Sequence, residues 1–225
     1  MLFRSVGARA HSHPVTDVWA GPVTLDELAR PQFTLHSGGA AVDVSLAVHG
    51  DHQVSNALCA AAVALECGAT LEQVAAALAD AGPVSGHRMR VSTRADGVTV
   101  IDDTYNANPA SMRRAVQTAD WLARRQRRPF VVVVGTMLEL GPESARLHAE
   151  AAREIAHRKP ALVAAVGTFA RVFESLREAL GGRLITAADA DALGPKLKSA
   201  LRGNELVLLK ASRGVALERV LNYLT

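Results

Sequence analysis

The 225-residue sequence has few aromatic residues, only two cysteines and almost no excess of charge. Aromatic side chains make up 4% of it, so we expect an aliphatic core, as helices packed over a parallel sheet provide. A net charge of +3, without basic clusters interleaved with aromatics, argues against binding to nucleic acid. The longest apolar stretch, residues 57–65, is too short to span a bilayer.

The two cysteines, Cys59 and Cys67, lie in a long apolar, helix-like pattern. We expect both to be buried, reduced thiols, which fits a cytoplasmic protein. Residues 1–5 lack the apolar core of a signal peptide, and the sequence opens with no recognisable first element. We therefore expect the chain to begin in the middle of a larger protein. His11 and His13 lack a supporting cluster of ligands, so no metal site is expected there.

The first third of the chain predicts a hairpin followed by two helices. Residues 32–35 and 42–46 are typical of strands joined by a turn at Gly38-Gly39. An Ala-rich helix is expected over 54–66, and a second helix begins at the capping-box sequence that starts at Thr70. Residues 82–86 favour turns throughout, so the sequence predicts two domains, 1–86 and 87–225.

Strands and helices alternate regularly after this boundary. Alternation of this kind predicts an α/β fold with βαβ units and a Rossmann-like, mostly parallel sheet. The run of four valines at 131–134 is typical of a strand that is covered on both faces. Strands are expected at 89–93, 98–101, 130–134, 162–166, 184–185 and 205–209, and helices at 109–125, 143–157, 169–180, 189–201 and 215–224.

Three polar loops follow strands of this sheet, and ligands bind beyond the carboxyl ends of such strands. Residues 102–109 combine two carboxylates, a phenol and two carboxamides, of which helix capping explains only Asn108 and its neighbour Pro109. Residues 210–214 add positive charge beside Ser212, which could cap the last helix and attract an anion. Residues 135–141 favour a connection and a binding loop equally.

Outside these loops, Gln53 and Asn56 lie three residues apart and should share a helix face. Their amides could bind the edge of a nucleobase, or cap the helix that they open. Arg88, beside the domain boundary, could contact a phosphate or lie solvated on the surface.

These segments, in this order, resemble the Mur ligase family and within it the MurF type. The sequence DDTYNANPASM at 102–112 is similar to the MurF pattern D-D-[ST]-Y-N-A-N-P-x-S-M. Further similar segments are GDHQVSNA from Gly50, GHRM at 86–89, MLELG at 137–141 with His148 after it, and KASR at 210–213. The resemblance covers nearly all of the chain from about residue 33 onward.

The resemblance implies an ATP-dependent ligase that adds D-alanyl-D-alanine to UDP-N-acetylmuramoyl-tripeptide through an acyl phosphate. Residues 1–86 would be the end of a central ATPase domain, and 87–225 a complete C-terminal domain. The resemblance implies ATP-binding roles for Gln53, Asn56, Arg88 and Asp103, of which Arg88 and Asp103 would also take part in catalysis. It implies that the D-alanyl-D-alanine pocket is bordered by Tyr105, Asn106, Asn108, Ser212 and Arg213. A monomer is expected.

The sequence departs from the family pattern at Gln53, Thr136 and Ala211, which stand where Asn, Asp and Gly are usual. No G-x-x-G-K-[ST] sequence occurs, so the chain has no P-loop. The Mg²⁺ ligands and the UDP-sugar domain of the family are expected outside this sequence. We therefore expect the chain by itself not to ligate.

Two alternatives remain at this point. One is another ligase of the superfamily, of the MurE type or a folylpolyglutamate synthase, although these have other residues in place of the 105–108 sequence. The other is a non-catalytic module that binds a nucleotide or a peptide.

Overall fold

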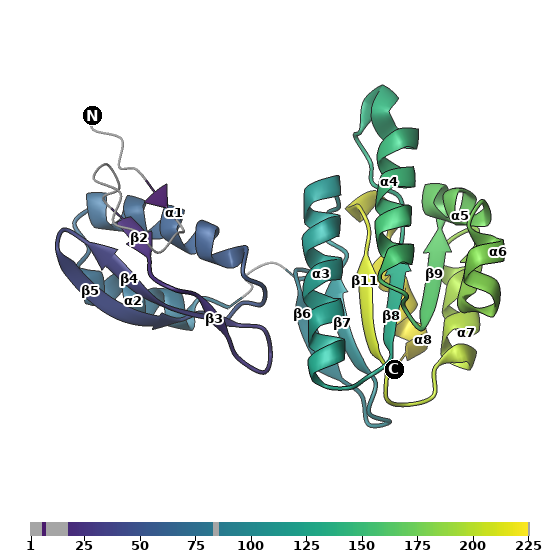
Figure 1. The fold of residues 1–225 in the computed structure, drawn as a ribbon, viewed down its shortest axis with the longest axis horizontal. Helices are drawn as coiled ribbons and strands as arrows, with labels where there is room; N and C mark the ends of the chain where they lie inside the picture. Colours follow the sequence, from purple (N-terminus) through teal and green to yellow (C-terminus); the bar gives the residue numbers. More distant parts are fainter. Residues whose placement is uncertain (1–5, 8–17, 83–85, 225) are drawn as a thin grey trace. The chain divides into compact units, whose positions relative to one another are not determined.

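The computed structural model describes residues 6–7, 18–82 and 86–224. The chain forms two compact units, Met1–Val84 and Ser85–Thr225, each of which has its own sheet (Figure 1). Residues 83–85, in the predicted boundary, lie outside the described residues.

Unit 1 packs two helices against a small sheet. Strand β4 is its centre and pairs with β2, β3 and β5, while β1 pairs with β2. The elements are β1 (Val6–Gly7), β2 (Val18–Ala20), β3 (Thr24–Leu25), β4 (Pro31–Ser37), β5 (Ala40–Ser45), α1 (Gln53–Glu66) and α2 (Leu71–Asp80).

The local sequence explains these elements. Gly38 and Gly39 both have positive φ, as a two-residue hairpin turn between β4 and β5 requires. Thr70 and Gln73 form the predicted capping box at the start of α2. The hairpin, the turn and both helices of this unit were therefore predicted correctly.

Unit 2 is a sheet with helices on both faces. Its elements are β6 (Arg90–Thr93), β7 (Thr99–Asp103), α3 (Pro109–Arg125), β8 (Phe130–Val134), α4 (Ser144–His157), β9 (Leu162–Val166), α5 (Gly167–Glu174), α6 (Arg177–Leu180), β10 (Leu184–Ala187), α7 (Ala190–Ala200), β11 (Leu206–Lys210) and α8 (Leu221–Leu224), with 3₁₀ segments η1 (Gly141–Glu143), η2 (Gly181–Arg183), η3 (Arg213–Val215) and η4 (Leu217–Val220).

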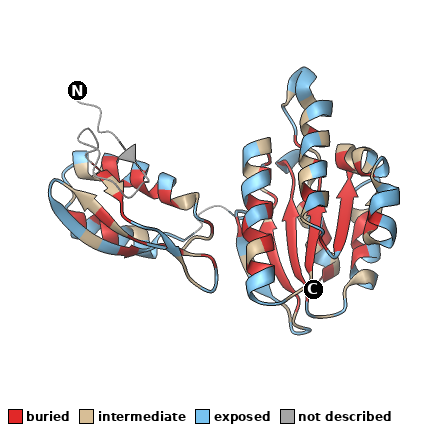
Figure 2. Cartoon of the chain, viewed as in Figure 1, coloured by how far each residue is buried: buried red, intermediate tan, exposed pale blue. Residues whose placement is uncertain are grey.

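The strand order is β10-β9-β8-β11-β7-β6, and every pair except β6–β7 is parallel. This confirms the predicted Rossmann-like, mostly parallel sheet. The central strands are buried along their whole length, since α3 and α4 lie over one face and α7 and α8 pack on the other (Figures 1 and 2).

Two predicted helices of unit 2 are wrong in extent. The helix predicted over 169–180 is divided into α5 and α6, because the Ser175 hydroxyl donates to the Val172 carbonyl and Leu176 leaves helical geometry. The helix predicted over 215–224 is interrupted at Ala216, whose φ of 53° is left-handed. Two 3₁₀ turns therefore precede the short helix α8.

The predicted burial of the cysteines is also wrong, since Cys59 and Cys67 are free and exposed. Helix α1 buries a face that includes Val54, Leu58 and Ala61, and Cys59 lies outside it. Because an Ala-rich helix is apolar on all sides, its composition does not reveal which face will pack. No described helix is long and apolar enough to cross a membrane.

Candidate functional site

The loops that follow β7 and β11 meet at one rim of the sheet. The two strands are parallel neighbours, and Lys210 at the end of β11 lies opposite Asp103 at the end of β7. Beyond the strands, the Ser212 hydroxyl donates to the Ala107 carbonyl over 3.2 Å. The prediction that both polar loops share one rim is therefore confirmed.

Lys210 holds the first of these loops from inside the protein. Its side chain is 2% exposed, and its ammonium donates to a carboxylate oxygen of Asp103 over 2.6 Å and to the Asn106 carbonyl over 2.8 Å. The second Asp103 oxygen accepts the Met89 amide. Lys210 was expected to add positive charge to the loop that could attract an anion, but its ammonium lies inside the protein and pairs with Asp103. An unpaired carboxylate in this largely buried position would be costly.

Tyr105 places two guanidinium groups at this rim. The Arg88 guanidinium carbon lies 3.9 Å from the centre of the Tyr105 ring, and that of Arg213 lies 5.5 Å from it. Cations bind the electron-rich face of such a ring. The Tyr105 amide also donates to the carbonyl of His87, whose imidazole contacts buried Asp102 at 2.6 Å. The Tyr105 ring therefore binds the exposed guanidinium groups of Arg88 and Arg213 at one end of the sheet.

Asn106, Asn108 and Ser212 make their hydrogen bonds within the rim itself. The side-chain oxygen of Asn108 accepts a hydrogen bond from the Ser111 amide and so caps α3, as predicted. The Asn106 side-chain oxygen accepts the Ala107 amide. Buried Ser212 accepts the Leu138 amide, so the predicted capping of the last helix by its side chain is wrong. A substrate-binding role for these three residues stays a prediction.

The loop after β8 is tied into the same rim through His148. This fully buried imidazole accepts the Met137 amide at Nε2 over 2.9 Å and donates from Nδ1 to the Ser144 carbonyl. Burial lowers the pKa of His148, because the charged form loses hydration, and this outweighs the opposing effect of the Ser144 carbonyl. The neutral ring thus fixes residues 137–138 against Ser212.

Two departures from the family pattern have structural explanations. The Thr136 hydroxyl accepts the Thr168 amide at the start of α5, which is a capping role that a carboxylate also performs. Ala211 is fully buried, and a Cβ added at Gly135 would lie 2.9 Å from the Ala211 Cβ. The extra methyl of Ala211 therefore packs into the core and does not keep a ligand away from the backbone.

Gln53 and Asn56 belong to α1 of unit 1. The Asn56 amide nitrogen donates to the Gln53 side-chain oxygen over 2.8 Å, so the two share a helix face as predicted. This bond leaves the Gln53 amide nitrogen as a donor and the Asn56 side-chain oxygen as an acceptor. Such a donor–acceptor pair fits the edge of an adenine base.

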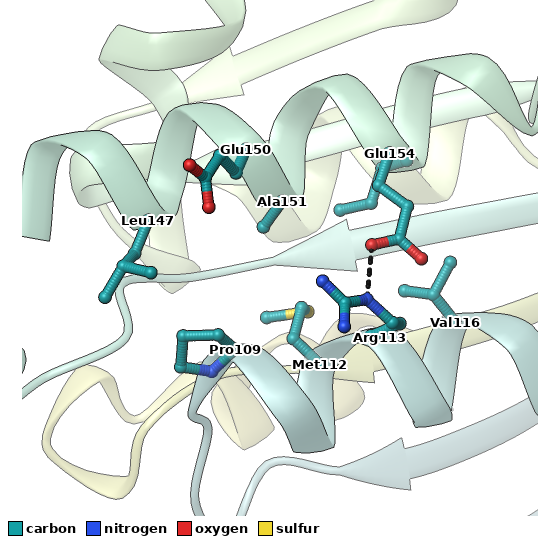
Figure 3. Close-up of a pocket in the computed structure, with 9 residues that line it drawn as sticks. Pro109, Met112, Arg113, Val116, Leu147, Glu150, Ala151 and Glu154 are labelled. Carbon is teal, nitrogen blue, oxygen red and sulfur yellow. Dashed lines mark hydrogen bonds and ion pairs between the residues drawn. The ribbon is translucent and has the colours of Figure 1, made fainter.

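A hollow of about 300 Å³ lies at the rim of unit 2. It is lined by Gly86, His87, Thr104, Tyr105, Arg213 and Glu218. The crevice between α3 and α4 is different, since its volume of about 20 Å³ has room for little more than one water molecule (Figure 3). Arg113 and Glu154 form an ion pair across it. The rim hollow is therefore the better candidate for a substrate site.

Sequence reasoning missed two residues of this rim. His148 was noted only as part of a motif, and its contact with Met137 depends on how α4 packs. Glu218 was placed within a continuous helix, and nothing in its sequence neighbourhood marked it. Among the described residues, which exclude His11 and His13, no three potential metal-ligating side chains gather.

The sheet, its rim and the hollow define a Rossmann-like domain that is suited to bind a small polar ligand. The family described as "Mur ligase, glutamate ligase domain" matches residues 87–213. The UDP-N-acetylmuramoyl-tripeptide--D-alanyl-D-alanine ligase of Mycobacterium tuberculosis (strain CDC 1551 / Oshkosh) is 49% identical over 222 residues, covering 91% of this chain and 44% of that protein. The enzyme of the same name from Escherichia coli (strain K12) is 34% identical, covering 86% of this chain and 41% of the relative.

Solved structures agree with these relatives. A crystal structure of MurF from Acinetobacter baumannii has a TM-score of 0.81 at 27% identity, covering 98% of this chain and 52% of that one. The chain belongs to the Mur ligase family. It spans less than half the length of the two relatives described above.

Proposed function

We propose that this chain is the carboxyl-terminal part of a ligase of the MurF type, which joins D-alanyl-D-alanine to UDP-N-acetylmuramoyl-tripeptide at the expense of ATP. The observation that carries the proposal is the rim of unit 2, where residues 102–109 and 210–213 form one hydrogen-bonded structure. The 49% identical relative bears the name of this reaction.

The cations of the rim suit a reaction that passes through concentrated negative charge. The peptide carboxylate would be activated as an acyl phosphate, which the amine of the dipeptide attacks to form the amide and release phosphate. Arg88 is exposed and its guanidinium lies over the Tyr105 ring, so its N–H donors are available to phosphate oxygens. Asp103, fixed by Lys210 and the Met89 amide, would accept from a ribose hydroxyl.

The remaining rim residues would form the dipeptide pocket. Arg213 would bind the carboxylate of D-alanyl-D-alanine, beside Tyr105 and Asn106, while Ser212 and Asn108 keep the loops in place. In unit 1, the Gln53 and Asn56 amides would bind adenine. Residues 1–86 would be the end of a central ATPase domain, whose P-loop and Mg²⁺ ligands lie outside this sequence. The proposed protein acts in the cytoplasm as a monomer.

A chimera tests this proposal. We would replace the matching segment of the M. tuberculosis relative with this chain and measure phosphate release from ATP. Release should require both UDP-N-acetylmuramoyl-tripeptide and D-alanyl-D-alanine. The R213M chimera should lose most of the phosphate release that depends on the dipeptide. A chimera that folds and binds ATP but shows no dipeptide-dependent phosphate release would contradict the proposal.

The isolated chain gives a complementary measurement. By itself it should bind D-alanyl-D-alanine in a calorimeter but release no phosphate from ATP, because it contains no P-loop. Turnover by the isolated chain would contradict the assignment of the ATPase machinery to the part of the relatives that this chain does not match. Because binding without turnover also describes a non-catalytic module, the chimera decides between that module and a ligase.

A further inference from the structure

Glu218 contributes a carboxylate to the rim hollow that the assigned roles leave unused. The hollow brings Glu218 together with Arg213, Tyr105 and His87. Within residues 6–7, 18–82 and 86–224, the Glu218 side chain makes no hydrogen bond and no ion pair. An acid and an arginine thus line the same hollow without neutralising each other.

The backbone explains why Glu218 lies there. Ala216 adopts a left-handed conformation with φ of 53°, which turns the chain after the Arg213 loop into the 3₁₀ segment η4. Leu217 and Val220 of this segment are fully buried and anchor it in the core on either side of Glu218. The position of the half-buried carboxylate is therefore set by core packing.

The ligand that matches this hollow carries both charges. An extended dipeptide is about 7 Å long and, with free ends, has an ammonium at one end and a carboxylate at the other. A hollow of about 300 Å³ is large enough for two alanine residues. Arg213 suits the carboxylate because a guanidinium forms paired hydrogen bonds with it. The ammonium then needs an acceptor, and Glu218 is the carboxylate that lines the hollow.

We propose that Glu218 binds the ammonium group of the incoming dipeptide. It thereby selects dipeptides with an unblocked amino terminus and positions the nitrogen, which attacks once the ammonium has lost a proton. This inference rests on the proposed function, and it adds a substrate-binding residue that the sequence motifs do not include. It also explains why Glu218 has no counter-ion among the described residues, because the substrate supplies one.

Calorimetry with three probes tests the inference on the 225-residue chain. The probes are D-alanyl-D-alanine, its N-acetyl derivative without the ammonium, and D-alanyl-D-alaninamide without the carboxylate. The unmodified chain should bind D-alanyl-D-alanine about tenfold to a hundredfold more tightly than the N-acetyl derivative. E218Q should lose this discrimination while its affinity for the N-acetyl derivative stays the same. E218D should retain part of it.

Controls separate this inference from the function on which it rests. E178Q, which neutralises an exposed glutamate of α6, should bind all three probes as the unmodified chain does. R213M should instead abolish the preference for D-alanyl-D-alanine over the amide. If the unmodified chain binds but E218Q discriminates equally well, the role of Glu218 is wrong and the dipeptide site stands. If the unmodified chain binds none of the probes, the proposed dipeptide site is wrong, and the proposed role of Glu218 is wrong as well.

Discussion

At the scale of single residues, the rim depends on a charge pair between a buried lysine and a largely buried aspartate. Lys210 and Asp103 lie 2.6 Å apart, and the lysine also supports the loop through the Asn106 carbonyl. Removing one member of such a pair leaves the other charge buried without compensation, which is more costly than removing both. The pair therefore sets both the stability of unit 2 and the shape of the candidate site.

We predict that K210M lowers the free energy of unfolding of unit 2 by about 3–5 kcal/mol. Urea unfolding measures this loss, and K198M, at an exposed position of α7, should change the stability by less than about 0.5 kcal/mol. The double variant K210M/D103L should recover part of the loss, because no unpaired charge stays buried. Equal losses in K210M and K198M would show that the pair does not stabilise the fold.

The residue scale is also where the sequence was least informative. The pattern around residue 210 indicated a basic loop. The sequence is the same whether the Lys210 side chain points into the protein or out to solvent. The direction of the Lys210 side chain follows from the register that places it opposite Asp103, and register is a property of the sheet. The same holds for His148, whose contact with Met137 joins a loop to the next helix.

At the scale of elements, strongly periodic segments could be predicted to the residue. The bounds of α3, β8 and β9 agree with the sequence prediction, because caps, buried β-branched runs and glycines mark them. The failures occurred where a local hydrogen bond or an unusual backbone angle overrides helix propensity, at Ser175 and Ala216. Periodicity does not contain this information.

The contact between α4 and the loop after β8 makes stability depend on pH. His148 is neutral when folded and has a lowered pKa, so the unfolded chain binds a proton more readily than the folded one. Its contribution to stability is present above the unfolded pKa of about 6.5 and is lost as the pH falls from there toward the folded pKa.

We therefore compare the unmodified chain with H148Q, whose side-chain oxygen can still accept the Met137 amide but does not titrate. H148Q should be less stable at pH 7.5, and the difference between the two proteins should shrink as the pH falls to 5.5, by up to about 1.4 kcal/mol for each pH unit. The other histidines titrate in both proteins and cancel in this comparison. A difference that stays constant with pH would show that His148 is not held neutral by the fold.

At the scale of the whole molecule, each of the two compact units contains a hydrophobic cluster of its own. One hydrophobic cluster consists of residues between Val18 and Leu78, and the other of residues between Val98 and Leu224. The two clusters have no residue in common. Each unit therefore has the apolar interior that independent folding requires. The two tryptophans are divided in the same way, since Trp19 lies in β2 and Trp121 in α3.

We predict that the two units unfold in separate transitions. In W121F the remaining Trp19 reports on unit 1, and in W19F the remaining Trp121 reports on unit 2, so urea titrations of the two variants follow one unit each. The transition of unit 2 should have the steeper dependence on urea, because the larger unit exposes more surface. Introducing K210M decides the matter even if the two midpoints coincide, since it should move the Trp121 transition to lower urea and leave the Trp19 transition in place. Movement of both transitions together would mean that the chain folds as one cooperative body, and that the candidate site depends on both units for its stability.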